Sequence, residues 1–320
     1  MPVPSAGPLG GLIQAEWGTD ANPHPALVGT GASGSANALT VLRRTAFVPD
    51  GPAGVELPKQ AGQALVRWAQ DHALGQVGED LSAVAKRRER ALAQLRSQGK
   101  HVARVLLRPQ WRLVVGLGEK GNAHELGITL HGTYGWPIIP GSGLKGVTAA
   151  YVWDRAAKTA GGREIFRMVF GAPLPPSRRV SDREPGGGGT APEGRAGSEA
   201  EGRDHDKAAR GAVRFLDALA VDGPLTVSAD VLTPHVKPYY DTTRVRREGE
   251  EPEPPAEYHQ PVPVQFLTIT GGTFAADLVG DTEKITGFAA ARLREAVEDL
   301  GVGAKTAAGY GYMNAHRGGI

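Results

Sequence analysis

The sequence predicts an α+β fold of the ferredoxin-like (RRM-like) type, with strands and helices in the order βαββαβ. Apolar and β-branched residues alternate at 102–117, 211–221 and 262–270, as in strands, and helix-forming residues fill 144–158 and 281–300. This order gives an antiparallel sheet with two helices on one face. We expect the other face to be open, and such faces often bind RNA.

The composition excludes several classes of protein. The 320 residues include 36 Lys and Arg against 34 Asp and Glu, so no basic surface extends over the whole chain. There is no Cys, which rules out disulfides, thiolate zinc sites and cysteine nucleophiles. The N-terminus has no secretory signal, and no run of roughly 20 apolar residues exists to span a membrane. We therefore expect a cytoplasmic protein without a membrane partner.

We divide the chain into an N-terminal arm with a helical extension, 1–101, and a ferredoxin-like domain, 102–320. Residues 1–60 are rich in small residues and Pro and predict an irregular arm with one short helix at 37–47, whereas 61–98 predict helix. The basic side chains that follow are Lys86, Arg87, Arg88, Arg90, Arg96, Lys100, Arg104, Arg108 and Arg112. They form either a solvated helix face or a surface that contacts phosphates, since phosphate binding needs charge more than strict geometry.

The elements of the second domain follow from local patterns. The strand at 102–117 is expected to bend near Pro109, and Ser142 stands where the N-cap of the next helix belongs. Residues 226–232 predict a further strand. The helix at 281–300 places Leu293 and Leu300 on one apolar face, and a Gly-rich segment then leads into a last strand.

Two segments of this domain predict no regular structure. Residues 172–210 are rich in Gly, Pro and charge, cannot bury enough apolar surface to offset their ordering entropy, and predict a disordered insertion. Residues 236–261 predict a polar, Pro-containing loop, which either projects from the domain or is an ordinary surface loop.

Three motifs match known sites only as text. Gly116, Gly118 and Gly121 fit the dinucleotide fingerprint, but no helix opens there and no acidic residue follows at the ribose position. Residues 303–306 resemble the end of a Walker A loop without its glycines. His124 and Glu125 lack an HExxH context, and the nine His are scattered. We therefore expect no cofactor, no metal and no catalytic residue.

Two Gly-rich segments carry more information. In the first, 139–146, a helix N-terminus offers free N–H groups and a positive partial charge, which together suit a phosphate. The second, 301–311, is too Gly-rich for a helix and places basic, hydroxyl and aromatic side chains beside the sheet. Each could also be only a tight turn. The candidate RNA-binding residues are Ser142, Gly143 and Lys145 in the first and Gly303, Lys305, Thr306 and Tyr310 in the second.

Together these segments resemble the RAMP superfamily of CRISPR proteins, and most closely the family of sixth-named Cmr subunits of type III-B effector complexes. The resemblance spans residues 102–314. It is carried by WRLVVGLG (111–118), LHGTYGWPIIPGSGLKG (130–146), VRFLDA (213–218), DVLTPHVKPYY (230–240), PVPVQFLTI (261–269) and GVGAKTAAGYG (301–311), with His124 and Glu125 in the matching region between the first two. The chain departs from the family pattern at Gly143, where a second Ser is usual, and at Val236, where the family has Tyr.

The resemblance implies a non-catalytic subunit that binds CRISPR RNA and target RNA at the head end of the effector filament in antiviral defence. The implied protein partners are the backbone RAMP, small helical and companion head-end RAMP subunits. It also implies that 236–261 is a thumb-like loop against the guide–target duplex. The residues implied to contact RNA there are His235, Tyr239, Tyr240, Arg244 and Arg246. His235 could equally be structural.

Two alternatives stay open. The first is a metal-independent RAMP endoribonuclease that processes CRISPR precursor RNA with His124 or His131 as general base. Backbone RAMPs that cut target RNA use an Asp after their first strand, and residues 117–140 contain Glu119 and Glu125 but no Asp. The second alternative is a scaffold that contacts only neighbouring subunits.

Overall fold

The computed structural model describes residues 5–6, 37–44, 46–47, 65–66, 69–70, 74, 79–118, 126–172, 208–221, 225–233, 254, 261 and 263–319. The helices are α2 (Ala38–Arg44), α4 (Glu79–Ser97), α5 (Gly141–Ala156), α6 (Ala160–Phe170), α8 (Glu283–Asp299) and the 3₁₀ helix η1 (Thr306–Ala308). The strands are β1 (Ser5–Ala6), β2 (Ala46–Phe47), β3 (His101–Pro109), β4 (Gly171–Ala172), β5 (Ala209–Arg210), β6 (Val213–Phe215), β7 (Leu219–Ala220), β8 (Val227–Leu232), β9 (Val264–Ile269), β10 (Phe274–Gly280) and β11 (Met313–Gly318). None of the helices within these ranges combines the length and hydrophobicity that a membrane crossing needs.

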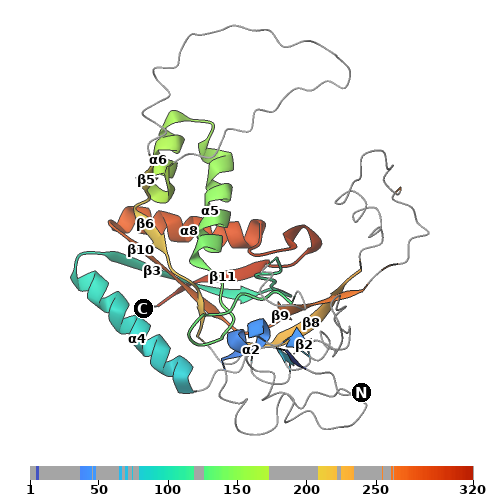
Figure 1. The fold of residues 1–320 in the computed structure, drawn as a ribbon. Coiled ribbons are helices and arrows are strands. Elements are labelled where there is room, and N and C mark those ends of the chain that lie inside the picture. The colour runs from blue at the N-terminus through green and yellow to red at the C-terminus, as the bar shows by residue number, and fades with distance from the viewer. Residues whose placement is uncertain are drawn as a thin grey trace.

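The main sheet has the strand order β11-β3-β10-β6, and β7 also pairs with β10. Each pair of neighbours is antiparallel, with Leu107 of β3 opposite Phe274 of β10. Helices α5 and α8 pack against one face of this sheet and against each other (Figure 1). The expected α+β class, with helices on an antiparallel sheet, is therefore confirmed.

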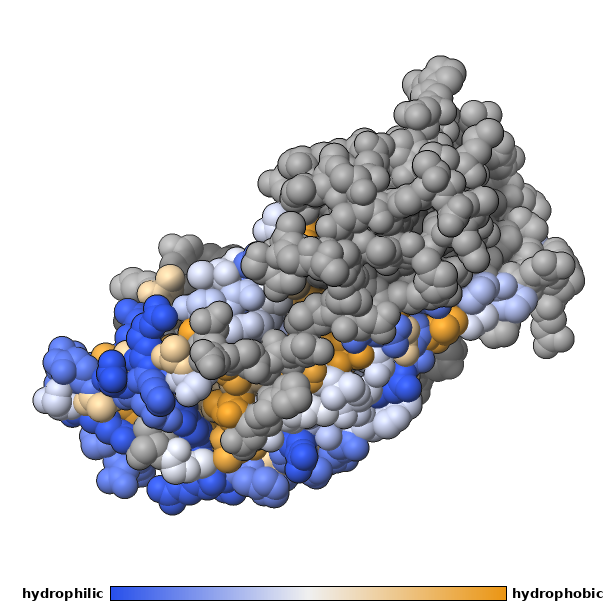
Figure 2. Space-filling model, turned by 90° about the horizontal axis from the view of Figure 1, so that it is seen from below, coloured by the Kyte–Doolittle hydropathy of each residue, from blue (hydrophilic) through white to orange (hydrophobic). Residues whose placement is uncertain are grey.

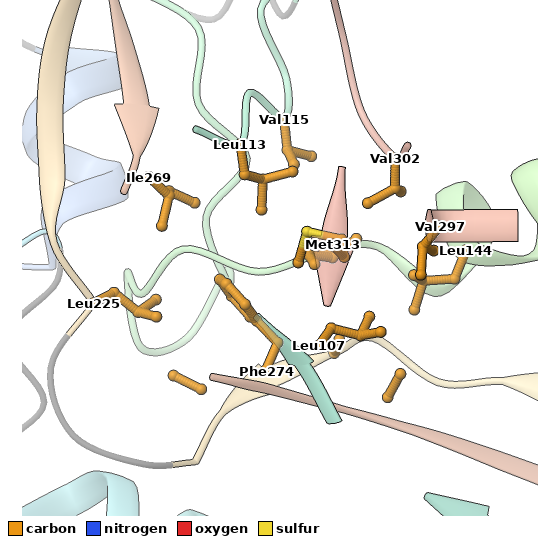
Figure 3. Close-up of a cluster of buried hydrophobic side chains, with 14 of the residues drawn as sticks. Leu107, Leu113, Val115, Leu144, Leu225, Ile269, Phe274, Val297, Val302 and Met313 are labelled. Carbon is orange, nitrogen blue, oxygen red and sulfur yellow. The ribbon is translucent and has the colours of Figure 1, made fainter. Parts of the chain in front are cut away.

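The core lies between this sheet face and the two helices. Along β10 the residues Phe274, Ala276 and Leu278 alternate toward it, and Leu107 of β3 and Met313 of β11 complete the centre (Figure 3). The apolar face of α8 meets this centre through Leu293, whereas Leu300 beyond the helix end is exposed, contrary to expectation. Residues that precede the expected boundary at 101/102 belong to the same core, namely Ala38, Val41, Leu42, Leu65, Val66, Ala69, Leu74 and Leu81.

The opposite face of the sheet carries helix α4, so the expectation of an open face is wrong here. Helix α4 lies on the other side of the sheet from α5 and α8 (Figure 1). Its Arg88 Nε donates to Asp277 Oδ2 of β10 at 2.6 Å, and Arg104 Nε of β3 donates to Asp277 Oδ1 at 2.7 Å. Asp277 is fully buried. Two residues of the basic run thus bind a carboxylate inside the protein rather than an external phosphate.

The exposed side of α4 remains strongly hydrophilic. Seen from below, polar and charged residues gather at the end of the molecule that holds this helix (Figure 2). Lys86, Arg87 and Arg90 are exposed there, while Val84 and Leu92 are buried against the protein. For these three cations the structure fits a solvated helix face.

Strands β8 and β9 form a separate two-stranded sheet beside the main one. The strands expected at 226–232 and 262–270 are therefore confirmed, but they lie outside the main sheet. The long strand expected at 102–117 instead ends at Pro109, and the chain then crosses to β9 through a bridge between Leu113 and Ile269. Similarly, the strand expected at 211–221 is split into β6 and β7.

Two further expectations about local structure need correction. Helix α5 begins at Gly141 with Pro140 as its N-cap, so Ser142 is in the first turn and caps nothing. Helix α6 was not expected at all, although Phe166 and Phe170 pack its apolar side against Trp153 and Phe215. At the ends of the expected insertion, β4 pairs with β5, so Ala172 and residues 209–210 are strand. Residues 173–207 lie outside the described parts.

Candidate nucleic-acid interface

The Gly-rich segment 301–311 connects α8 to β11 and is anchored by backbone hydrogen bonds. The N–H of Ala304 donates to the Val114 carbonyl, and the N–H of Gly311 donates to the Arg112 carbonyl, each at 2.7 Å. Gly303 has a φ of 95°, and a Cβ there would lie 2.2 Å from the Val114 oxygen. A side chain at this position would therefore push the loop off residues 112–114.

The backbone of Lys305 adopts the left-handed conformation, which is uncommon for a residue other than Gly. Its φ of 60° is the single left-handed value among the described non-glycine residues, and it directly precedes η1, which begins at Thr306. Its ammonium lies 5.3 Å from the centre of the Phe266 ring, a cation–π distance. The loop thereby holds a positive charge over an aromatic face of β9.

The side chain of Tyr310 is buried, and its hydroxyl group forms a hydrogen bond. The hydroxyl donates to Asp230 Oδ2 at 2.7 Å, and Arg112 Nη1 lies 2.6 Å from the same oxygen. Burial alone would raise the pKa of Asp230, but the bonds from Tyr310 and from the Val231 N–H, with the charge of Arg112, lower it overall. Burial, followed by the bond to Asp230, raises the pKa of Tyr310.

Trp111 is the exposed member of this group, and sequence reasoning did not select it. Its side chain is 54% exposed, its ring centre is 5.0 Å from that of Tyr310, and the Arg112 guanidinium lies 5.2 Å from it. Tyr310 in turn meets Phe266 edge-on at 6.0 Å. We call Trp111, Tyr310 and Phe266 the aromatic platform. A Trp placed directly before an Arg at a strand end was the available signal.

The first turn of α5 forms the second candidate region. The N–H of Gly141 donates to Asp217 Oδ1 at 2.7 Å, so a carboxylate of the protein already occupies one of the free helix donors. The N–H groups of Ser142 and Gly143 have no partner within the described parts of the chain, and both residues are exposed. Lys145 is half-buried one residue after Leu144, which anchors the turn in the core.

Comparison with known proteins identifies the fold family. Residues 25–314 match the RAMP superfamily. The chain belongs to this superfamily. The resemblance found in the sequence is thereby confirmed. The family match also includes residues 25–101, most of the region that the sequence predicts to be an N-terminal extension.

The RAMP chain is also similar to individual proteins. It is 30% identical over 229 residues to the CRISPR system Cmr subunit Cmr6 of Pyrococcus furiosus, which covers 64% of this chain and 65% of that protein, just under two thirds. A type III-B Cmr-beta structure bound to cognate target RNA matches with a TM-score of 0.53 and 18% identity, over 80% of this chain and 71% of the other. The crystal structure of Cmr6 from Pyrococcus furiosus has 26% identity and a TM-score of 0.35 over 68% and 98%.

The structure relates the two Gly-rich segments of this chain through the core. Leu144 of α5 and Val302 of the 301–311 segment belong to one buried cluster (Figure 3), so Ser142, Gly143 and Lys145 extend from the same core as Gly303, Lys305 and Thr306. Within the described ranges no hydrogen bond or ion pair joins the polar groups of the two segments directly. The expected thumb-like residues His235, Tyr239, Tyr240, Arg244 and Arg246 lie outside the described residues.

Of the two candidate catalytic histidines, His131 belongs to the described residues and His124 does not. His124 lies outside the described residues. His131 is half-buried in a turn, where its Nδ1 accepts from the N–H of Thr133 at 3.2 Å and its ring contacts Tyr134. These contacts indicate that the His131 side chain has a structural role in this turn. Across the described parts of the chain, no three His, Asp or Glu side chains gather as metal ligands.

Proposed function

We propose that this RAMP chain is a non-catalytic RNA-binding subunit of the Cmr6 type in a type III-B effector complex, where it holds the 3′ side of the guide RNA and its target. The aromatic platform carries the proposal: exposed Trp111 lies beside Arg112 and contacts Tyr310, and Lys305 lies over Phe266. The similarity to Cmr6 over about two thirds of the chain supports the assignment to that complex. The implied partners are guide and target RNA and the neighbouring RAMP and small helical subunits.

The chemistry of the platform suits single-stranded or splayed RNA. An exposed indole offers a face on which a base stacks, and nearby cations attract the phosphates on either side of that base. Tyr310 and Phe266 support Trp111 from within, and because Tyr310 is 9% exposed its role is to position Trp111. Lys305 and the first turn of α5 then supply charge and N–H donors for the backbone.

We further assign the main sheet to the ferredoxin-like class and residues 301–311 to the glycine-rich loop of RAMP proteins. The order β11-β3-β10-β6, with α5 between β3 and β6 and α8 between β10 and β11, supports this assignment. The Gly-rich segment lies between the last helix, α8, and the last strand, β11, as the local sequence pattern predicts. We also propose that the protein is located in the cytoplasm.

Substitution at Trp111 tests the proposal. Because base stacking contributes about 1–3 kcal/mol per base, Trp111→Ala should weaken binding of a guide-length RNA about 5- to 150-fold, while Trp111→Phe keeps most of the affinity. Lys305→Ala should reduce the slope of log affinity against log salt by about 0.7. Fluorescence anisotropy of the purified chain across a salt series measures both effects.

The matched control is Arg87→Ala, which removes an exposed cation from the far side of α4. RNA affinities within twofold for Trp111→Ala, Lys305→Ala and the control would reject the platform as an RNA site. Photo-crosslinking of 4-thiouridine RNA in the assembled complex distinguishes an RNA-binding subunit from a scaffold. An RNA-binding subunit should crosslink at residues 111 and 305, whereas a scaffold that contacts only neighbouring subunits should not. Cleavage of repeat RNA by the isolated chain without metal would instead support the endoribonuclease alternative.

A further inference from the structure

A cavity of about 640 Å³ opens at the end of the main sheet opposite the aromatic platform. It lies where β3 and α8 begin and β11 ends, whereas the platform lies beyond the end of β3. Along β3 the cavity lining ends at Val105, four residues or about 13 Å before the strand ends at Pro109. The cationic side chains that line the cavity are Arg96, Lys100, Arg104, Lys284, Arg294 and Arg317. Glu283 is the acidic residue in the lining.

Three of these cations have no counter-ion in the described structure. Lys284 and Arg294 extend from α8 and Arg317 from β11, and all three are exposed and take part in no ion pair or hydrogen bond with a described residue. Lys100, in contrast, pairs with Asp281 at 2.7 Å. Cations from two elements that face one space without acidic partners repel one another, and an anion between them relieves that repulsion.

A further guanidinium is fixed at the inner wall. Arg104 is 9% exposed and shares the single buried carboxylate of Asp277 with Arg88. Its other acidic neighbour, Glu89, is 54% exposed and 3.7 Å away. Burial alone would lower the pKa of Arg104, but the bond and charge of Asp277 raise it overall, so this wall stays positive. Arg104 is therefore held in place by one buried carboxylate and one exposed carboxylate at the inner end of the cavity.

The cavity also contains an unpaired stretch of strand edge. Strand β11 pairs with residues 104–109 of β3, and β10 covers the other edge of β3 from residue 101 onward. The β11-side edge of residues 101–103 has no strand partner within the described chain and lines the cavity. Backbone N–H groups at such an edge are additional donors for an anion.

We propose that this cavity is a second anion site that binds a phosphate-bearing ligand, either a free nucleotide or a phosphodiester segment of RNA. Its volume lies in the range of small-molecule sites, about 300–1,000 Å³. The guanidinium groups of Arg294 and Arg317 offer planar forks that match phosphate oxygens, and Lys284 adds a point charge. The site goes beyond the function proposed above, because the aromatic platform is at the other end of the sheet.

The test replaces the three unpaired cations together. The variant Lys284→Ala/Arg294→Ala/Arg317→Ala is compared with Lys86→Ala/Arg87→Ala/Arg90→Ala, which removes the same charge from the exposed side of α4. All six residues are exposed, so both variants should fold. Isothermal titration with uridine 5′-monophosphate, with an eight-nucleotide single-stranded RNA and with an octa-glutamate peptide measures affinity, and hydrogen exchange of residues 101–105 locates the bound probe.

The cavity variant should bind the phosphate probe about tenfold more weakly than the α4 variant, and its salt slope for RNA should fall by about 2. Binding of the mononucleotide identifies a free nucleotide as the source, and binding of the RNA alone identifies a phosphodiester. Equal affinities of the two triple variants, or binding of octa-glutamate with neither phosphate probe, would overturn the proposal. Hydrogen-exchange protection by the mononucleotide at residues 101–105, and not around Trp111, assigns its binding to the cavity, so failure here is separable from failure of the platform.

Discussion

Asp217 determines how much of the first turn of α5 is available to a ligand. Its carboxylate accepts the N–H of Gly141, and its own carbonyl accepts from Arg88 Nη1 at 2.7 Å. The helix end therefore already has one negative charge, which opposes a second anion at the N–H groups of Ser142 and Gly143.

The two glycines of this turn have different roles. A Cβ on Gly141 would lie 2.2 Å from the Phe215 carbonyl oxygen, so the helix can approach β6 only because this residue is Gly. A Cβ on Gly143 would meet no atom within 4 Å. Gly141 is therefore required by packing, whereas Gly143 leaves open space in which an RNA backbone could lie.

Removal of the charge at Asp217 tests whether a phosphate binds this turn. Asp217→Asn keeps an acceptor for Gly141 but removes the competing anion, so RNA should bind about two- to fivefold more tightly, in line with the 0.3–1 kcal/mol effect of a charge at a helix end. Asp154→Asn, at an exposed position near the other end of α5, is the matched control. Anisotropy at low salt measures both, and equal affinities would exclude phosphate from the turn.

Among the elements, helix α4 is held against the sheet by a buried charge cluster. Asp277 accepts hydrogen bonds from Arg88 and Arg104, and the sequence separation of 189 residues between Arg88 and Asp277 joins the helix to a distant strand. Removal of one member of such a cluster strongly destabilises a protein, since the remaining charges stay buried without compensation.

Asp277→Asn should therefore lower the free energy of unfolding by about 3–5 kcal/mol. Arg88→Met removes bonds to one charged group and to the Asp217 carbonyl, and should cost less, about 1.5–3 kcal/mol. Urea denaturation gives both values, with Arg87→Ala as a control that should stay within about 0.5 kcal/mol of the wild type. If Asp277→Asn matched that control, the cluster would not stabilise the docking of α4.

At the scale of the whole molecule, three parts meet at Asp230. Arg112 follows β3 of the main sheet, Asp230 belongs to β8 of the smaller sheet, and Tyr310 comes from the Gly-rich segment. The lowered pKa of Asp230 and the raised pKa of Tyr310 both mean that this junction is most stable with an ionised Asp and a protonated Tyr.

The stability of the protein should therefore depend on pH at both extremes. The contribution of Asp230 is fully present above its unfolded pKa of about 3.9 and is lost as the pH falls through its lower folded pKa. The contribution of Tyr310 is fully present below about 10 and is lost as the pH rises through its raised folded pKa.

Asp230→Asn isolates the acid branch. The variant should be about 1.5–3 kcal/mol less stable at neutral pH, because a hydrogen-bonded charge is lost, and its stability should fall less between pH 5 and pH 2.5. Urea midpoints across that range, compared with the wild type and with Asp154→Asn, provide the measurement. Parallel curves for the wild type and Asp230→Asn would mean that Asp230 does not link the junction to pH.

Local pattern predicted most of the individual elements. The strands at 226–232 and 262–270 and the helix at 281–300 were recognisable because alternation and helical periodicity are properties of a few neighbouring residues. Helix α6 is not recognisable from its sequence, AGGREIFRMVF, because two glycines stand in its first turn. Its apolar side is buried against residues of α5 and β6 that are distant from it in the local pattern.

The sequence by itself determined the family of this protein and the two Gly-rich segments, since motif spacing is a linear property of the chain. Only the tertiary structure decided which charges and rings are available. Arg88 and Tyr310 are bound internally, Trp111 is exposed, and Lys284 and Arg317 line one cavity. Each of these outcomes depends on residues far apart in the chain, and burial of a charge is decided by whether a partner arrives with it.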